Sequence, residues 1–200
     1  MHPNFTIISG GQTGVDTAVL KTAITHRIPY TGFVPRGFTN ERGRILDEYI
    51  TSTYGSLRET ESLDTAERTR LNCDEADGLL TLAACDEDAI QKLSRGTELG
   101  ITVGREGGKD MCFVDLRRYR ADKEGEVDKV IKWLDETNVE RCAIGGPRES
   151  EESGVEREAE EVLGRVWEKV KARGWRNVRV SGGPGRAKVE PFLRDNRWTS

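Results

Sequence analysis

Histidine is scarce in this chain: only His2 and His26 occur among its 200 residues. So small a number argues against histidine-based catalysis and against a metal site built from several histidines. The four cysteines, which include no C-x-x-C pair, are Cys73, Cys85, Cys112 and Cys142. Their long, unequal spacing predicts reduced, mostly buried thiols rather than a zinc site or a disulfide framework, so we expect no metal ligated by these residues.

Long apolar runs are lacking as well. No stretch of the sequence approaches the roughly 20 residues that a membrane-spanning helix needs, and the N-terminal residues do not have the pattern of a signal peptide. We therefore expect a cytoplasmic protein without a membrane partner. The net charge of −4 argues against broad nucleic-acid binding, although it is compatible with a local basic site for a small anion.

Short β-branched runs alternate with longer helical patterns, which predicts an α/β fold: a parallel sheet with helices on both faces. The predicted strands are Phe5–Ser9, the segment around Ile28–Val34, Gly78–Ala83, Met111–Leu116 and Arg141–Gly145. The predicted helices are Val15–Thr25, Thr65–Cys73, Thr97–Arg105, Glu126–Glu136 and Gly154–Arg173. In such folds ligands bind beyond the carboxyl ends of the strands, which places the glycine-rich turns at the functional edge.

A glycine-rich turn follows the first predicted strand and consists of Gly10, Gly11, Gln12, Thr13 and Gly14. Glycine adopts backbone angles closed to other residues and lets a ligand approach the main chain. A helix that starts just after Gly14 aims its free N–H groups at this turn, so the turn is a candidate phosphate-binding loop. The spacing matches neither a Walker loop nor the G-x-G-x-x-G dinucleotide motif. The alternative is a tight strand-to-helix turn that binds no ligand.

A second turn of this kind follows the predicted strand at 141–145 and leads into the last predicted helix. Its residues are Gly146, Pro147, Arg148, Glu149 and Ser150. The guanidinium of Arg148 and the hydroxyl of Ser150 add anion donors to the backbone amides. The alternative is that Arg148 and Glu149 form a solvated surface pair while Ser150 caps the helix.

Several motifs resemble one known family, in the same order along the chain from about Ile7 to Leu163. They are Ile8-Ser-Gly-Gly-Gln-Thr-Gly-Val-Asp16, Pro35-x-Gly37, Glu41-x-Gly-x-Ile45, Arg68-Thr-x-x-Asn72, Asp77, Gly96-Thr97 and Gly146-Pro-Arg-Glu-Ser150. The sequence is similar to the circularly permuted YpsA-like proteins, often labelled "putative molybdenum carriers".

The resemblance implies a Rossmann-like domain of the SLOG superfamily, whose members handle nucleotides or phosphorylated pterins. It implies that the two glycine turns are walls of one pocket for a small phosphorylated or anionic ligand. Molybdenum cofactor, molybdate and a nucleotide are all candidate ligands. Because SLOG relatives commonly form dimers, we also expect a homo-oligomer.

The chain departs from related motifs at two places. The family usually has an arginine after Gly-Val-Asp, where this chain has Thr17. The phosphoribohydrolase relatives have a Pro-Gly-Gly-x-Gly-Thr-x-x-Glu motif, of which only the Gly-Thr core, Gly96 and Thr97, is present here. The second departure argues against their hydrolytic chemistry.

The segment from Gly37 to Asn72 is long for a connection between strands, which is typical of a functional lid or a flexible segment. Within it, Arg68, Thr69 and Asn72 lie about one helical turn apart and are placed to present polar groups to a ligand. A solvated helix face, with Arg68 paired to Glu67, is the alternative. Asp16 also has two interpretations, because it either hydrogen-bonds the ligand or only caps the first helix.

We expect residues 1–174 to form one domain and residues 175–200 to form a C-terminal extension. The Val178, Val180 and Ser-Gly-Gly pattern of the extension predicts an added edge strand or a contact with another subunit. Its large apolar residues would be costly to expose, so we expect them to be buried: Trp175, Phe192, Leu193 and Trp198.

Two classes of function are compatible with these features. The first is a carrier or sensor that binds a nucleotide-like or molybdopterin-like ligand and needs no catalytic base. The second is a hydrolase that cleaves an N-glycosidic bond of a nucleotide, in which Glu98 or Asp16 would activate water or stabilise the ribose cation. A purely structural interaction module would leave both glycine turns unexplained.

Overall fold

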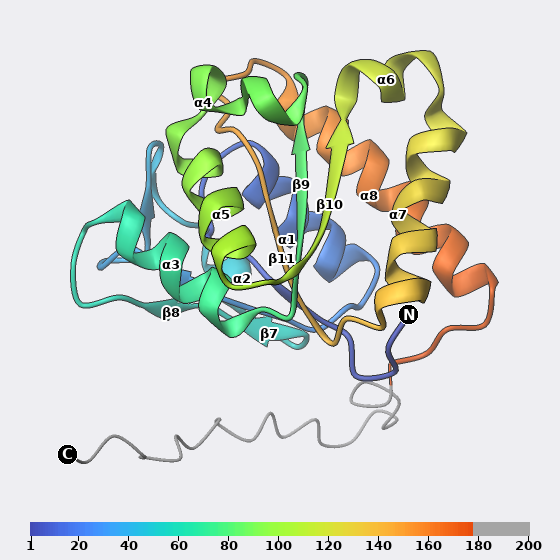
Figure 1. Cartoon of the computed structure of the whole chain (residues 1–200). Helices are drawn as coiled ribbons and strands as arrows, with labels where there is room; N and C mark the ends of the chain where they lie inside the picture. The colour runs from blue at the N-terminus through green and yellow to red at the C-terminus, as the bar shows by residue number, and fades with distance from the viewer. Residues whose placement is uncertain (178–200) are drawn as a thin grey trace.

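A mostly parallel sheet forms the centre of the computed structural model, which describes residues 1–177 (Figure 1). Within these residues the sheet has seven strands in the order β10-β9-β11-β1-β2-β7-β6, and only β6 is antiparallel to its neighbour. The strands are β1 (Thr6–Ile8), β2 (Tyr30–Thr31), β6 (Thr51–Ser52), β7 (Gly55–Ser56), β9 (Gly78–Ala83), β10 (Asp110–Asp115) and β11 (Arg141–Gly145). Two small sheets pair β3 (Phe33–Val34) with β8 (Arg58–Glu59) and β4 (Thr39–Asn40) with β5 (Gly43–Arg44).

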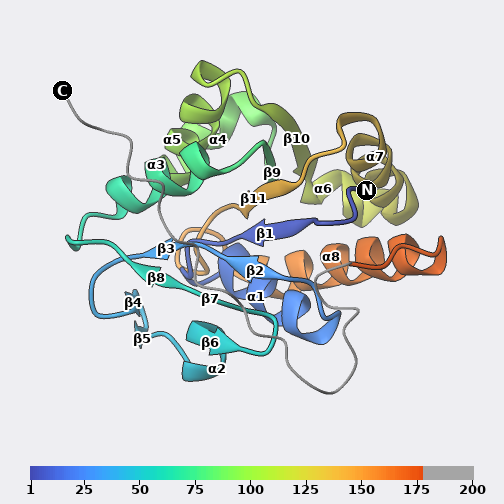
Figure 2. The same ribbon diagram turned by 90° about the horizontal axis from the view of Figure 1, so that it is seen from below.

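Helices cover both faces of this sheet (Figure 2). They are α1 (Val15–Thr25), α2 (Asp47–Ile50), α3 (Thr65–Glu75), α4 (Ile90–Leu93), α5 (Arg95–Glu106), α6 (Leu116–Ala121), α7 (Lys123–Thr137) and α8 (Val155–Ala172). A 3-10 turn, Glu87–Ala89, precedes α4. The α/β fold with a parallel sheet and helices on both faces, predicted from the sequence, is confirmed.

The two-residue period of the strands divides the core between the faces. Leu80 and Leu82 of β9 belong to the largest buried cluster, which joins the sheet to α1, α7 and α8. Leu79 of the same strand points the other way and packs with Cys73 of α3. Ala83 likewise packs with Ile101 of α5. The helices α3 and α5 therefore form the layer opposite to α1, α7 and α8.

The segment around Ile28–Val34 was expected to be one strand, and the structure corrects this prediction. It divides at Gly32 into β2, in the main sheet, and β3, in a separate small sheet. Gly32 has φ of +149°, and a Cβ there would lie 1.9 Å from the carbonyl oxygen of Ser9. The strand divides because the backbone of the neighbouring chain segment passes directly against this residue.

The predicted helices are all present, and several are longer than expected. α3 continues to Glu75, α5 begins at Arg95, and α7 begins at Lys123. Side chains explain two of these starts, because Ser94 accepts a hydrogen bond from the Thr97 N–H and Asp122 accepts one from the Gly125 N–H. The long segment before Asn72 contains β4 to β8 and α2, none of which the sequence patterns predicted.

The first residues of the expected C-terminal extension contact the N-terminal end of the chain. Trp175 is partly buried against the core and donates through Nε1 to the carbonyl oxygen of His2 at 3.0 Å. Asn177 donates to the carbonyl oxygen of Phe5 at 2.8 Å. The predicted edge strand or subunit contact, and the expected burial of Phe192, Leu193 and Trp198, lie outside the described residues. No helix within residues 1–177 is long and apolar enough to cross a membrane.

Leu134 tests the packing of α7 against the sheet. Its side chain is 1% exposed, so Leu134→Ala should lower the free energy of unfolding by about 2–5 kcal/mol, because apolar contacts are lost and a cavity remains. Urea denaturation followed by circular dichroism measures this change. Lys132→Ala, on the exposed side of α7, should change it by less than about 0.5 kcal/mol. Equal losses for the two variants would contradict the described packing.

Candidate functional site

The two glycine-rich turns touch each other at the carboxyl edge of the sheet. They follow β1 and β11, which pair in parallel with Ile8 opposite Ala143. The backbone N–H of Val15 donates to the carbonyl oxygen of Pro147 at 3.3 Å, and the N–H of Glu149 donates to Thr13 Oγ1 at 3.3 Å. Thus residues about 135 positions apart in the sequence form one wall.

Close packing explains three of the glycines. A Cβ on Gly14 would lie 2.4 Å from the Pro147 carbonyl oxygen, and one on Gly146 would lie 2.2 Å from that of Leu82. A Cβ on Gly10 would lie 1.6 Å from Nη1 of Arg68. Gly14 and Gly146 therefore leave no room for a side chain against the backbone, and a side chain at Gly10 would displace the guanidinium of Arg68.

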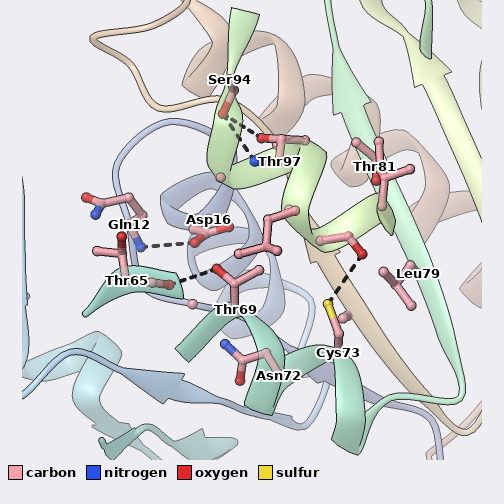
Figure 3. Close-up of a pocket in the computed structure, with 18 of the residues that line it drawn as sticks. Gln12, Asp16, Thr65, Thr69, Asn72, Cys73, Leu79, Thr81, Ser94 and Thr97 are labelled. Carbon is pink, nitrogen blue, oxygen red and sulfur yellow. Dashed lines mark hydrogen bonds between the residues drawn. The ribbon is translucent and has the colours of Figure 1, made fainter. Parts of the chain in front are cut away.

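A cavity of about 310 Å³ opens beside the turns, between α3 and α5 (Figure 3). Its inner wall is partly apolar and includes Ile8, Leu79, Leu80 and Ala143. Three guanidinium groups and two carboxylates also line it: Arg68, Arg95, Arg148, Asp16 and Glu151. The charged lining is therefore positive by one charge, which favours an anion.

Asp16 and Arg68 form a nearly buried ion pair in this lining. Oδ2 of Asp16 lies 3.2 Å from Nη1 of Arg68, and the two side chains are only 7% and 14% exposed. The same oxygen accepts the Gln12 N–H at 3.1 Å. Burial raises the pKa of Asp16 above its usual value, although the Arg68 charge and this hydrogen bond act in the opposite direction. Arg68 pairs with Asp16 rather than with Glu67, whose carboxylate accepts the Ser62 hydroxyl.

Arg148 differs from Arg68 because its guanidinium has no hydrogen-bond or ion-pair partner within residues 1–177. It is half-buried and lines the cavity. Its backbone is engaged instead: the N–H donates to Glu151 Oε2 at 2.8 Å, and the carbonyl oxygen accepts the N–H groups of Glu151 and Glu152 at 3.1 and 3.0 Å. Its charge still lowers the pKa of both Asp16 and Glu41, although burial is the larger influence on each. Arg148 is therefore the cation in the cavity that is placed to accept an incoming anion.

The start of α5 supplies a further part of the cavity wall. Gly96 and Thr97 both line the cavity, and a Cβ on Gly96 would meet no atom within 4 Å. Thr97 donates its hydroxyl to Ser94 Oγ at 2.9 Å. Ser94 and Thr65 also line the cavity and were not singled out from the sequence, because a lone Ser or Thr at the start of a helix does not by itself indicate a ligand.

Asn72 lies in the same wall, where it has a structural partner. Its amide accepts the Phe33 N–H at 2.7 Å and donates to the Phe33 carbonyl oxygen at 3.0 Å. It thereby joins α3 to β3. The neighbouring Thr69 hydroxyl donates to the carbonyl oxygen of Thr65 at 2.9 Å.

Several residues predicted to bind a ligand do not line the cavity. They are Gly11, Thr13, Gly14, Pro147, Glu149 and Ser150, and the candidate catalytic Glu98 is also outside this lining. The carboxylate of Glu149 accepts the N–H groups of Gly154 and Glu156 at 2.6 and 3.0 Å, so it caps α8. Gly11 packs against Val34 and Ile45.

Glu41 holds these outer residues together and was noted in the sequence only as part of a motif. Its carboxylate accepts hydrogen bonds from the hydroxyl groups of Thr13 and Ser150 and, at 3.4 Å, from the Ser150 N–H. Burial opposes ionisation of Glu41, but these hydrogen bonds outweigh it and lower the pKa. Gln12, which does line the cavity, accepts the Glu41 N–H through Oε1 at 3.0 Å.

Metal ligands are not gathered at this site. No group of three or more His, Cys, Asp or Glu residues in the described part of the chain is arranged to hold a metal ion. Cys73 lines the cavity, but burial raises the pKa of its thiol to about 11. The side chain is therefore a neutral thiol near pH 7.

Comparison with known proteins gives two matches. The model of the circularly permutated YpsA SLOG family matches residues 7–167. The crystal structure of a "putative molybdenum carrier protein" from Syntrophus aciditrophicus SB is similar, with 31% sequence identity and a TM-score of 0.70. That similarity covers 81% of this chain and 93% of the other chain. No curated protein matches the chain.

Gly146 and Gly96 form a matched pair for testing the packing of the site. Gly146→Ala should lower the free energy of unfolding by about 1–3 kcal/mol, because its Cβ would overlap backbone that cannot withdraw easily. Gly96→Ala enters open space in a helix and should not lower stability. Thermal and urea unfolding of both variants measure the difference. Unchanged stability of Gly146→Ala would contradict the close contact with Leu82.

The stabilisation from Glu41 should depend on pH. Because the pKa of Glu41 is lowered in the folded state, its contribution is fully present above the unfolded value of about 4.3 and is lost as the pH falls through the folded value. The stability difference between the wild type and Glu41→Gln should therefore shrink below about pH 4.3. Urea denaturation at several pH values measures it. A difference that grows towards low pH would show that the assigned direction is wrong.

Proposed function

The chain belongs to the circularly permutated YpsA SLOG family, and we propose that it binds or carries a small phosphorylated or oxyanion ligand, either nucleotide-like or similar to the molybdenum cofactor. The observation that carries this proposal is the guanidinium of Arg148. It lines a cavity of about 310 Å³ and has no partner within residues 1–177. A half-buried cation without a partner gains most when an anion supplies charge-assisted hydrogen bonds.

The composition of the cavity also bears on the ligand. Arg148 and the open start of α5 offer donors for phosphate or oxyanion oxygens. The apolar side chains of Ile8 and Leu79 supply a surface for a ring or another apolar group. This combination fits a ligand that has both an anionic and an apolar part.

The donor set is compatible with a molybdenum-containing cargo held through oxygen atoms. Among residues 1–177 no group of three or more potential metal ligands is gathered, so the proposed contacts are to the oxygen atoms of the cargo. Arginine and backbone N–H donors instead suit the oxygens of molybdate or the phosphate of a pterin cofactor. The related crystal structure carries the name of a molybdenum carrier, which agrees with this proposal.

The alternative of an N-glycosidic hydrolase receives less support from the site. Glu98 does not line the cavity. Asp16 does line it, but its carboxylate is paired with Arg68 and accepts the Gln12 N–H. Both contacts engage Oδ2, so only Oδ1 of Asp16, which has no hydrogen-bond partner within residues 1–177, could accept a proton from an attacking water. The carrier function, which requires no base, therefore fits the geometry better.

A thermal-shift panel tests which ligand binds. The panel contains molybdate, tungstate, AMP, ADP-ribose, NAD and a pterin phosphate. A ligand at 100 times its dissociation constant should stabilise the folded protein by about 2.7 kcal/mol, which gives a clear rise in melting temperature. Release of a free base from a stabilising nucleotide would instead identify an enzyme.

Arg148→Ala should weaken binding of the stabilising ligand by about 10- to 150-fold, equivalent to about 1.5–3 kcal/mol, because a charge-assisted hydrogen bond is lost. Isothermal titration calorimetry measures the dissociation constant. Arg105→Ala is the matched control, because it removes one positive charge from the far end of α5, where Arg105 pairs with Glu87. If the Arg148 variant and the wild type bind the ligand with equal affinity, Arg148 does not contact the ligand.

A further inference from the structure

The hairpin of β4 and β5 reaches across both glycine turns. At its tip, Glu41 accepts hydrogen bonds from Thr13 in the first turn and from Ser150 in the second. Glu41 is separated from Ser150 by 109 positions in the sequence. The contact is therefore made by the fold and not by local turn geometry.

The donors around Glu41 are those of an oxyanion site. Two hydroxyl groups and one backbone N–H converge on a carboxylate, and Arg148 contributes favourable charge from the cavity side. A phosphate or molybdate oxygen accepts hydrogen bonds from the same donors. We propose that Thr13 and Ser150 form a second oxyanion subsite, outside the cavity, which the carboxylate of Glu41 fills until an anionic ligand displaces it.

The hairpin is built so that its tip can leave while its base stays in place. Ile45, at the base, is 4% exposed and packs in the core, whereas Glu41 and Arg42 at the tip are exposed. Besides the carboxylate contacts, the Glu41 N–H donates to Gln12 Oε1 at 3.0 Å, and two neighbouring residues also hold the tip. Asn40 donates to the Gly11 carbonyl oxygen at 3.1 Å, and Arg42 pairs with Glu156 at 3.2 Å, where the arginine is 58% exposed. The exposed ion pair of Arg42 contributes little, so most of the hydrogen bonds that attach the tip come from Glu41.

This inference rests on the proposed function, because it concerns an anion that binds next to Arg148. Glu41 then acts as an internal competitor. The apparent affinity for an oxyanion at this subsite is reduced by the fraction of molecules in which Glu41 occupies it. Removing the carboxylate should therefore raise affinity, which is the opposite of the effect expected when a ligand-binding residue is removed.

The attachment is tested first without ligand. Arg42 and Arg44 lie in the hairpin, so limited trypsin digestion reports how often its tip detaches. Cleavage after these residues should be about tenfold faster in Glu41→Gln and Glu41→Ala than in the wild type. A tenfold change corresponds to a loss of about 1.4 kcal/mol in the free energy that holds the tip in place. Glu48→Gln, which removes an equal charge from exposed α2, should be cleaved like the wild type. Equal cleavage of all four proteins would overturn the proposal.

Binding of inorganic pyrophosphate to the full chain is then measured by calorimetry. Glu41→Ala should bind this probe about tenfold more tightly than the wild type or Glu48→Gln, because no internal carboxylate competes. Unchanged or weaker binding by Glu41→Ala would overturn the proposal, and so would an absence of binding to every variant.

Arg148→Ala in the Glu41→Ala background separates this inference from the proposed function. If affinity rises in Glu41→Ala and the additional loss of Arg148 has no effect, the outer subsite stands and the role of Arg148 in the proposed function fails. If Arg148→Ala weakens binding while Glu41→Ala leaves it unchanged, the proposed function stands and the outer subsite is overturned.

Discussion

The parallel pairing of β11 with β1 is the contact on which the rest of the site depends. It places Ile8 opposite Ala143, so the turns that follow these strands leave the sheet at the same edge. Two segments at opposite ends of the chain can then share hydrogen bonds, such as that between Val15 and Pro147. Without this pairing, neither turn has a partner, and neither the cavity nor the site of Glu41 would form.

Glycine at the contact is required by space and not only by flexibility. The two turns approach so closely at Gly14 and Pro147 that no Cβ fits between them. At Gly10 a Cβ would instead displace the guanidinium of Arg68 from its pair with Asp16. Glycine loses more conformational entropy on folding than other residues do. Here that loss is offset by close backbone contacts that a residue with a Cβ would not permit. The glycines of the two turns therefore serve mainly for close packing, and those beside the cavity are Gly10 and Gly146, together with Gly145 at the end of β11.

The sequence predicted the sheet better than it predicted the site. The run Gly78–Ala83 is β9 as expected, because a fully buried strand needs only a short, nearly continuous apolar segment. The division at Gly32 was not predictable, since it arises from the carbonyl oxygen of Ser9 in another segment. Both turns were correctly located, yet the sequence could not distinguish Arg148, which faces the cavity, from Glu149, which caps α8. Adjacent residues in an irregular turn point in directions that no short-range pattern determines.

The buried ion pair of Asp16 and Arg68 contributes less to the stability of the folded protein than apolar residues could in its place. Burial raises the pKa of Asp16, which means that the surrounding protein makes ionisation of this carboxylate more costly than water does. Apolar residues of similar volume would often stabilise a protein as well or better than such a pair. Nε of Arg68 is buried and has no hydrogen-bond partner among residues 1–177, which adds to the cost. Local departures from the most stable arrangement concentrate at functional sites. The presence of this pair in the wall that also contains Arg148 therefore supports a site shaped for an anion rather than a wall shaped only for stability.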